Sequence, residues 1–404
     1  MAVAQGISTT VSRVAQSGLG SPGSAGSALA RRVQLALNKQ SDTYQSQEIV
    51  SHQQSTGATE GPSGIQGSLN GEMSAGTYQI EMETLLRKAA AGTAAITGAG
   101  LTIATSGSNY SVTRSAGSWL SDGIKVGDVV RLSVGSLDAA NIARNLLVLD
   151  VVSATVLTVA PLNSGAMTPE GPVTGCTITV VGKKVWVPST GHLNRYLSYE
   201  KKYTDLTRYE LFTDVKVGSA DIAIPATGIS TVNFALMGLS RALSGSETLT
   251  SPTAETSSSV LAAVQGKVAV NGAVTTVTNV QVNINGNVSL AEAEIGSNSR
   301  SDLQRGRVQV SGSFAAKFSA VTLQTLRDAQ TVVTLIFVLA DSASNTAEFV
   351  SICLPACKLF SDDADDGEKE IIRTYTFTAQ YYGSGGSGVK HNATICQLQD
   401  SLFA

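Results

Sequence analysis

Charged and aromatic side chains are both scarce in this sequence. Of its 404 residues, 15% are charged and 5% are aromatic, and the formal net charge is −3. A mildly acidic chain has no electrostatic footprint for nucleic-acid binding unless its basic residues are segregated. So few aromatic rings also fall short of a sugar-stacking surface. The composition therefore disfavours a nucleic-acid-binding protein and a carbohydrate-binding protein.

Cysteine is scarce as well. The four cysteines, Cys176, Cys353, Cys357 and Cys396, are irregularly spaced, so they imply no disulfide framework. Cys353 and Cys357 lie four positions apart in an apolar run, which on an extended strand is too far to bridge. We expect buried thiols, with an intermolecular bridge as the less favoured alternative.

The chain has no recognisable catalytic constellation. His52, His192 and His391 each stand alone, with no Cys or acidic partner at a metal-ligand spacing. No nucleophile elbow or phosphate-binding loop is present. We expect no enzyme activity, no catalytic residue, no cofactor and no metal.

Long hydrophobic runs are missing too. The longest, Val332–Ala340, is too short to span a bilayer and is typical of a buried strand. The first residues lack the apolar core of a secretion signal. We expect a protein made in a cytoplasm, with no membrane insertion.

What the sequence does have is glycine and short runs of Val and Thr. The 39 glycines separate segments of alternating polarity, which indicates a mainly β protein with many turns. A polar stretch at 243–259 is typical of a linker.

A weak internal repeat organises the chain. Residues 48–75 resemble residues 294–320, with Gly67-Ser68 matching Gly312-Ser313, and VQLALN at 33–38 matches VQVNIN at 280–285. Each copy has the order strand, long loop, strand, helix. Ser74 and Ser319 are the expected helix N-caps. The expected apolar helix faces are Tyr78, Met82, Leu85, Leu86 and Ala89 in the first copy and Val321, Leu323, Leu326 and Ala329 in the second.

An insertion separates parts of the first copy. Residues 92–185 contain short alternating strands between Gly, Asp and Asn turns, which predicts a small β-barrel. We expect Trp119 and Leu120 to plug that barrel, with ligand stacking as the less favoured role of the tryptophan. The predicted domains are a first unit at 1–91 and 186–242 with an N-terminal arm at 1–30, the insert at 92–185, the linker at 243–259 and a second unit at 260–404.

Two kinds of polar segment are candidate contact sites. The long loops of the repeat are expected to contact other subunits, and their candidate residues are Ser51, His52, Gln53, Gln54, Arg300, Asp302 and Arg305. Six acidic residues crowd 361–370, and those singled out are Asp362, Asp363, Asp365, Asp366 and Glu368. The spacing fails the calcium-loop register. A solvated hairpin tip and a tip that meets a neighbouring subunit both remain open.

Several segments together resemble a known family. SYEKKYTDLTRYELFTDVKVGSADIAIPATGISTVNFALMG at 198–238 is similar to the tail tube proteins of long-tailed bacteriophages, as is the opening arm at 7–37. GSWLSDGIKVGDVVRL at 117–132 resembles an insert found in some members. The resemblance covers most of 1–240 and is weaker over 260–404, which the internal repeat connects to it.

The resemblance implies two tandem β-sandwich units, each with one flanking helix. In that family six units form a ring, their inner sheets join into a barrel around a lumen, and stacked rings carry DNA. Two units per chain would give rings of three chains. The arm and loops would contact the next ring, and the insert would project outward. Strand edges that must be paired, and a sheet face that repels DNA phosphates, agree with this.

The implied partners are other copies of the chain and further tail proteins, namely the tape measure, the tail terminator and the distal tail protein. DNA would pass without sequence-specific binding, and the protein would lie in the virion. The alternatives are a tail terminator or baseplate ring protein of the same fold, or an adhesin-like carbohydrate-binding β protein.

Overall fold

The computed structural model describes residues 3–24, 26–163, 165–318, 321–365 and 367–404. Strands hold 49% of the residues and helices 5%, with two α-helices, α1 (Gln79–Leu86) and α2 (Thr322–Asp328), in the described part. Short 3-10 turns occupy Gly6–Ser8 and Ala263–Gln265. The prediction of a mainly β fold is confirmed.

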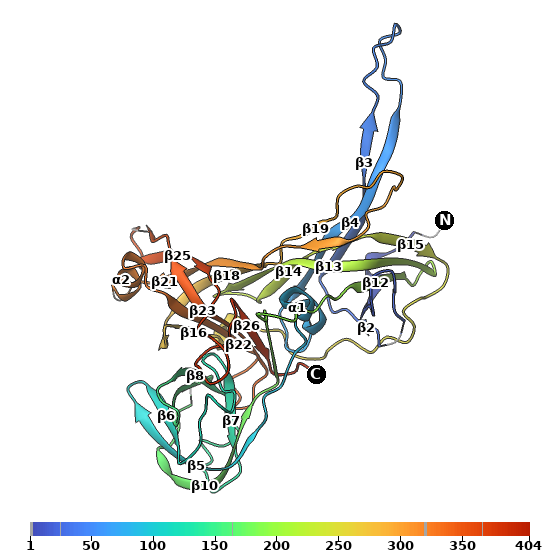
Figure 1. Ribbon diagram of the computed structural model, residues 1–404. Helices are drawn as coiled ribbons and strands as arrows, with labels where there is room; N and C mark the ends of the chain where they lie inside the picture. The colour runs from blue at the N-terminus through green and yellow to red at the C-terminus, as the bar shows by residue number, and fades with distance from the viewer. Residues whose placement is uncertain (1–2, 25, 164, 319–320, 366) are drawn as a thin grey trace.

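One antiparallel sheet of seven strands, the main sheet, runs across the molecule (Figure 1). In spatial order its strands are β3 (Gln34–Gln45), β4 (Ala58–Glu72), β14 (Thr231–Gly238), β13 (Arg208–Pro225), β18 (Val277–Asn285), β21 (Gln309–Lys317) and β25 (Ile372–Ala379). Apolar side chains such as Leu69, Phe234 and Phe314 alternate with polar ones, because successive residues of a strand face opposite sides. The apolar face covers the core, and many side chains of the polar face are exposed.

The remaining strands lie at the ends of the main sheet or behind its apolar face. On the first-half side these are β1 (Thr9–Ala15), β2 (Ala28–Leu29), β12 (Leu197–Tyr203) and β15 (Ser240–Ser244). On the second-half side they are β11 (Lys183–Trp186), β16 (Lys267–Val270), β17 (Ala273–Val274), β22 (Val333–Ala340), β23 (Phe349–Leu359), β24 (Asp363–Asp365) and β26 (Gln397–Asp400). A separate pair is β19 (Val288–Leu290) and β20 (Leu303–Arg305).

The two halves of the chain use their elements in the same order. The first half runs β3, β4, α1, β12, β13, β14, and the second runs β18, β21, α2, β22, β23, β25. In each half the second strand carries a glycine whose Cβ would meet a carbonyl oxygen of the first strand, 1.6 Å from Ala36 O at Gly67 and 2.1 Å from Gln281 O at Gly312. The unit boundaries of the sequence analysis stay a prediction.

The helices differ from expectation in their ends and exposure. Helix α1 begins at Gln79 with Tyr78 at its N-cap, so the prediction that Ser74 caps it is wrong; the Ser74 hydroxyl bonds to that of Thr77 instead. Ser319 lies outside the described residues. Ala89 is exposed beyond the end of α1, whereas every residue from Glu81 to Leu86 is buried. Helix α2 buries none of its described residues.

The insert is a closed six-stranded barrel, as expected. Its strands are β5 (Ile96–Ser106), β6 (Asn109–Arg114), β7 (Val129–Ser133), β8 (Leu146–Val151), β9 (Val156–Pro161) and β10 (Glu170–Val180). Trp119 is fully buried in the core of this barrel, as predicted, whereas Leu120 is partly buried against the same apolar cluster. The Arg114 guanidinium lies over its ring, 4.8 Å from the centroid.

The inserted barrel is not a separate appendage of the chain, and its outward projection stays a prediction. The barrel packs against the outer strands of the second half, and one apolar cluster includes Trp119 together with Ile336, Phe349 and Cys353. Strand β11, which follows the barrel, pairs with β26 of the second half. The insertion therefore links two parts of the chain that are distant in sequence (Figure 1).

Candidate functional site

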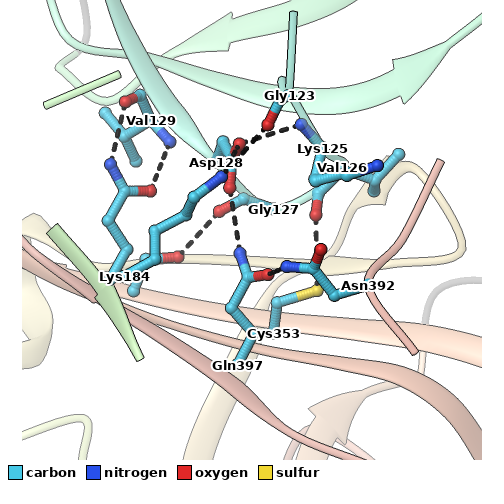
Figure 2. A network of polar contacts seen from close by, with 12 residues as sticks. Gly123, Lys125, Val126, Gly127, Asp128, Val129, Lys184, Cys353, Asn392 and Gln397 are labelled. Atoms are coloured by element: carbon cyan, nitrogen blue, oxygen red, sulfur yellow. Dashed lines mark hydrogen bonds and ion pairs between the residues drawn. The ribbon is translucent and has the colours of Figure 1, made fainter. Parts of the chain in front are cut away.

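A network of buried polar groups fixes the barrel to the second half (Figure 2). The Asp128 carboxylate accepts hydrogen bonds from Lys184 Nζ at 2.8 Å, from Gln397 Nε2 at 2.9 Å and from the Lys125 backbone NH at 2.8 Å. The side chains of Asp128 and Lys184 are 0% and 4% exposed. Because buried charges are stable only when they are paired and hydrogen-bonded, this network fixes one geometry for the docked barrel.

The main sheet ends in two strand edges that have no strand partner within the described residues. At one end β3 pairs with β4 alone. At the other end β23 pairs with residues 377–379 of β25, and the short β24 extends the sheet beside residues 372–374 and pairs with β25 alone. Exposed edges with unpaired NH and C=O groups are templates for pairing with another chain. The molecule therefore carries an unpaired edge at each end of one continuous sheet.

In the middle of the same sheet, the two halves are joined by strand pairing. Residues Ser219–Pro225 of β13 pair with Asn279–Asn285 of β18. At Asp221 the side chain accepts a hydrogen bond from the Asn283 amide, so side chains as well as backbone connect the halves. We call this pairing of β13 with β18 the joint. It shows within one chain how one half binds another.

Helix α1 and a loop of the second half reinforce the joint. Arg87, at the end of α1, donates to the carbonyl oxygens of Gly286 and Gly306 at 2.8 and 2.7 Å. Lys216 Nζ donates to Leu303 O at 2.8 Å, and burial lowers the pKa of this lysine. Backbone carbonyls thus satisfy two buried cations between the halves.

Asp302 and Arg305 lie in this joint. The Tyr196 hydroxyl donates to Asp302 at 2.7 Å, and Arg305 donates to the Leu193 carbonyl at 2.6 Å. Burial alone would raise the pKa of Asp302, but the bonds from Tyr196 and the Leu303 NH, together with nearby Lys216, lower it. Both residues contact the first half of their own chain.

The other loop candidates lie on a long projection. Strands β3 and β4 extend beyond the body as a hairpin whose tip carries Ser51, His52, Gln53 and Gln54, all exposed (Figure 1). Gln53 has a φ of 54°. Residues 58–63 belong to β4, so the loop is shorter than expected. Arg300 reaches the hairpin base, 3.3 Å from Asp42.

Part of the acidic segment is a short strand, and the described residues after it lead into β25 as the turn of a hairpin. Asp363–Asp365 form β24 and pair with Thr374–Ile372 of β25. Asp362 accepts a hydrogen bond from Arg373 at 2.7 Å, and Glu368 is exposed. Asp366 lies outside the described residues. The acidic residues thus occupy the unpaired end of the main sheet.

The central rows of the polar face of the main sheet carry little charge, whereas Lys317 lies on the same face nearer its edge. One row of directly paired residues crosses all seven strands, and its members are Gln34, Asn70, Asn233, Asp221, Asn283, Ser311 and Thr378. Of the rows on either side, one runs from Glu72 to Thr376 and the other from Ala36 to Gln309. Asp221 and Glu72 are the charged residues of these three rows, which contain neither Lys nor Arg.

A family comparison agrees with this arrangement of sheets and edges. The family model described as phage tail tube protein matches residues 6–379. The chain belongs to the phage tail tube protein family. The recognition made from the sequence is confirmed, and the match extends well into the second half, where the resemblance was weak. No curated protein matches this tail tube protein.

Membership identifies the tail tube protein as a structural component of the phage virion that self-assembles and associates with other tail proteins. Within the described residues, no helix is both long and apolar enough to cross a membrane.

Sequence reasoning missed the residues of the joint and of the docking network. Asn283 and Asp221 are ordinary polar residues of alternating strands, and Asp128 and Lys184 lie in a Gly-rich turn and a short strand. Only the parity of the strands, which places Asp221 and Asn283 on polar faces, could have drawn attention to the first pair.

Proposed function

We propose that this protein forms the wall of a hollow tail tube, in which chains join head to tail through the edges of their main sheets. The observation that carries the proposal is the pair of unpaired edges, β3 and β24, at opposite ends of a sheet whose halves are already joined edge to edge. A head-to-tail contact closes into a ring when its rotation allows. With two similar halves per chain, three chains supply six wedges.

The polar face then lines the lumen. Helix α1, the outer strands and the barrel all lie on the other side of the main sheet (Figure 1). Closing the sheet into a barrel places these thicker layers on the outside, where the circumference is larger. DNA would pass amides and hydroxyls with two carboxylates per chain in the three central rows. These rows hold no Lys or Arg, so this part of the wall offers no counterion release to hold the phosphates.

The hairpin of β3 and β4 stacks one ring on the next. It projects far from the main sheet, and its exposed tip is too polar for a core. Arg300 and the Asn298 carbonyl, which accepts from the Ser63 NH at 3.0 Å, brace its base from the second half. A hairpin of this length favours a stacked tube over a terminator or baseplate ring that closes once. The first and last rings would bind the other tail proteins.

Electron microscopy of the purified protein at rising concentration tests the proposal. We expect hollow filaments built of three-fold rings with six inner wedges. A variant in which a two-residue turn replaces residues 43–60 should form single rings that do not stack. Filaments of the shortened variant would contradict the role of the hairpin, and monomers of the full chain at every concentration would contradict the tube.

A further inference from the structure

The registers of the main sheet show which residues of the two halves occupy the same position. In the first half Gly67 of β4 is directly opposite Leu37 of β3, and in the second half Gly312 of β21 is opposite Val282 of β18. These are the two glycines whose Cβ would collide with the neighbouring strand. The residue after each partner is an asparagine, Asn38 in β3 and Asn283 in β18.

The same comparison extends across the next strands of the first half. Three residues after Gly67, Asn70 is opposite Asn233 of β14. Asn233 in turn is opposite Asp221 of β13. Asp221 therefore lies two strands away from β4, in the same row of paired residues as Asn70.

In the second half the identical path leads to the acidic segment. Three residues after Gly312, Ala315 is opposite Thr374 of β25, and Thr374 is opposite Asp363 of β24. Asp363 thus holds in the second half the position that Asp221 holds in the first. Two independent correspondences, Asn38 with Asn283 and Asp221 with Asp363, each join identical residue types.

We propose, on the basis of the proposed function, that Asp363 of one chain pairs with Asn38 of the next. Within the chain, Asp221 is opposite Asn283 and accepts its amide hydrogen bond. Asp363 and Asn38 are exposed, and their strands end the main sheet on opposite sides. Repeating the internal joint sets the Asn38 amide against the Asp363 carboxylate on the polar face.

The register of the whole contact follows from this pair. Antiparallel pairing places Ser361 opposite Gln40 and Asp365 opposite Ala36. The acidic segment of the sequence thereby acquires a partner, a second copy of this chain. A slip of one residue would turn the side chains of one strand to the other face of the sheet. The contact between Asp363 and Asn38 therefore also fixes the register of the two strands.

Apolar surface beside β24 supports the same occupant. Around α2, exposed apolar side chains gather next to the strand edge, with Val321 62% exposed and Phe360 49% exposed. The corresponding helix α1 is buried from Glu81 to Leu86, and Leu85 packs beside Gly286 of the second half. The second half of the same chain covers α1. In the proposed ring, the first half of the next chain would cover α2.

Disulfide trapping in assembled rings tests the pair. Opposed residues of antiparallel strands have Cβ atoms about 5 Å apart, within reach of a disulfide after small adjustment. The four native cysteines are buried, so they do not compete. Oxidation of Asn38→Cys/Asp363→Cys rings should give covalent species of up to three chains. The internal pair Asp221→Cys/Asn283→Cys is the positive control and should close within one chain.

The matched negative control shifts one cysteine by two residues. Asn38→Cys/Ser361→Cys should give little cross-linking, since diagonal neighbours are about 7–8 Å apart. Equal or stronger cross-linking of this shifted pair in assembled rings, or no cross-linking of either pair, would overturn the proposed contact and leave the tube intact. Absence of rings in the wild-type protein would overturn the tube itself, and the contact with it.

A swap of the two side chains provides a second readout. Asn38→Asp places two carboxylates against each other and should raise the concentration needed for assembly on the order of fivefold per contact. Adding Asp363→Asn restores the hydrogen-bonded pair in reverse and should recover assembly. Failure of the double variant to recover would count against the direct contact.

Discussion

Asp400 shows at the scale of one residue how the C-terminal strand depends on pH. Burial raises the pKa of its carboxyl to about 7, although the NH groups of Gly76 and Leu402 donate to it and act in the opposite direction. An unfolded Asp has a pKa of about 4, so between about pH 4 and pH 7 the folded state binds more protons. Stability therefore falls as pH rises through this range.

We expect Asp400→Asn to remove most of this dependence. The amide oxygen can still accept from Gly76 and Leu402, while no charge has to be buried above pH 7. Urea unfolding at pH 5 and pH 8 measures the effect, with the wild-type protein losing more stability than the variant between the two. Equal losses in both proteins would show that Asp400 does not titrate in this range.

Loss of the buried Lys184–Asp128 ion pair, which lies between the barrel and the second half, should lower the stability of the fold strongly. Lys184→Met leaves the Asp128 carboxylate buried without its cation, and should lower the free energy of unfolding by about 3 kcal/mol. The exposed pair Lys390–Asp150 spans the same junction and supplies the control. Lys390→Met should cost less than about 1 kcal/mol in the same urea titration. Similar losses for both variants would contradict the assigned difference in burial.

At the scale of the strand, the two matched glycines limit what the main sheet tolerates. Gly67→Ala and Gly312→Ala each place a Cβ against a backbone carbonyl that cannot move aside like a flexible side chain. We expect each to lower the unfolding free energy by about 1–3 kcal/mol or more. Gly57→Ala, with open space around it, should stay within about 0.5 kcal/mol. Thermal or urea unfolding of the three variants compares them directly.

For the whole molecule, the docked barrel changes what its removal should do. Replacing residues 92–185 by a short linker uncovers Ile336, Phe349 and Cys353 and leaves β26 without β11. We expect a sharp loss of soluble protein and aggregation in size-exclusion chromatography. Shortening the β5–β6 turn at 106–109, away from this contact, should leave yield unchanged. Normal solubility and assembly of the deletion variant would show that the barrel is not needed to cover the second half.

Local patterns account for much of what was predicted correctly. Alternation of polar and apolar residues placed strands at 33–38 and 280–285, and the turn-rich insert was recognised as a barrel with Trp119 inside. The predicted cap of α1 was wrong because Ser74 binds Thr77 instead. The loop candidates Asp302 and Arg305 had been assigned to subunit contacts, but polarity could not show that they already bind the first half of their own chain.

The sequence by itself determined the β class, the face to which each strand residue points, and the repeated order of elements. These depend on the period-two geometry of a strand and on turn residues, which act over a few neighbours. Only the tertiary structure decided that the barrel docks on the second half, that β13 pairs with β18, and that Asp221 meets Asn283. Such contacts join residues far apart in the chain, and their register depends on packing between strands rather than on either strand alone.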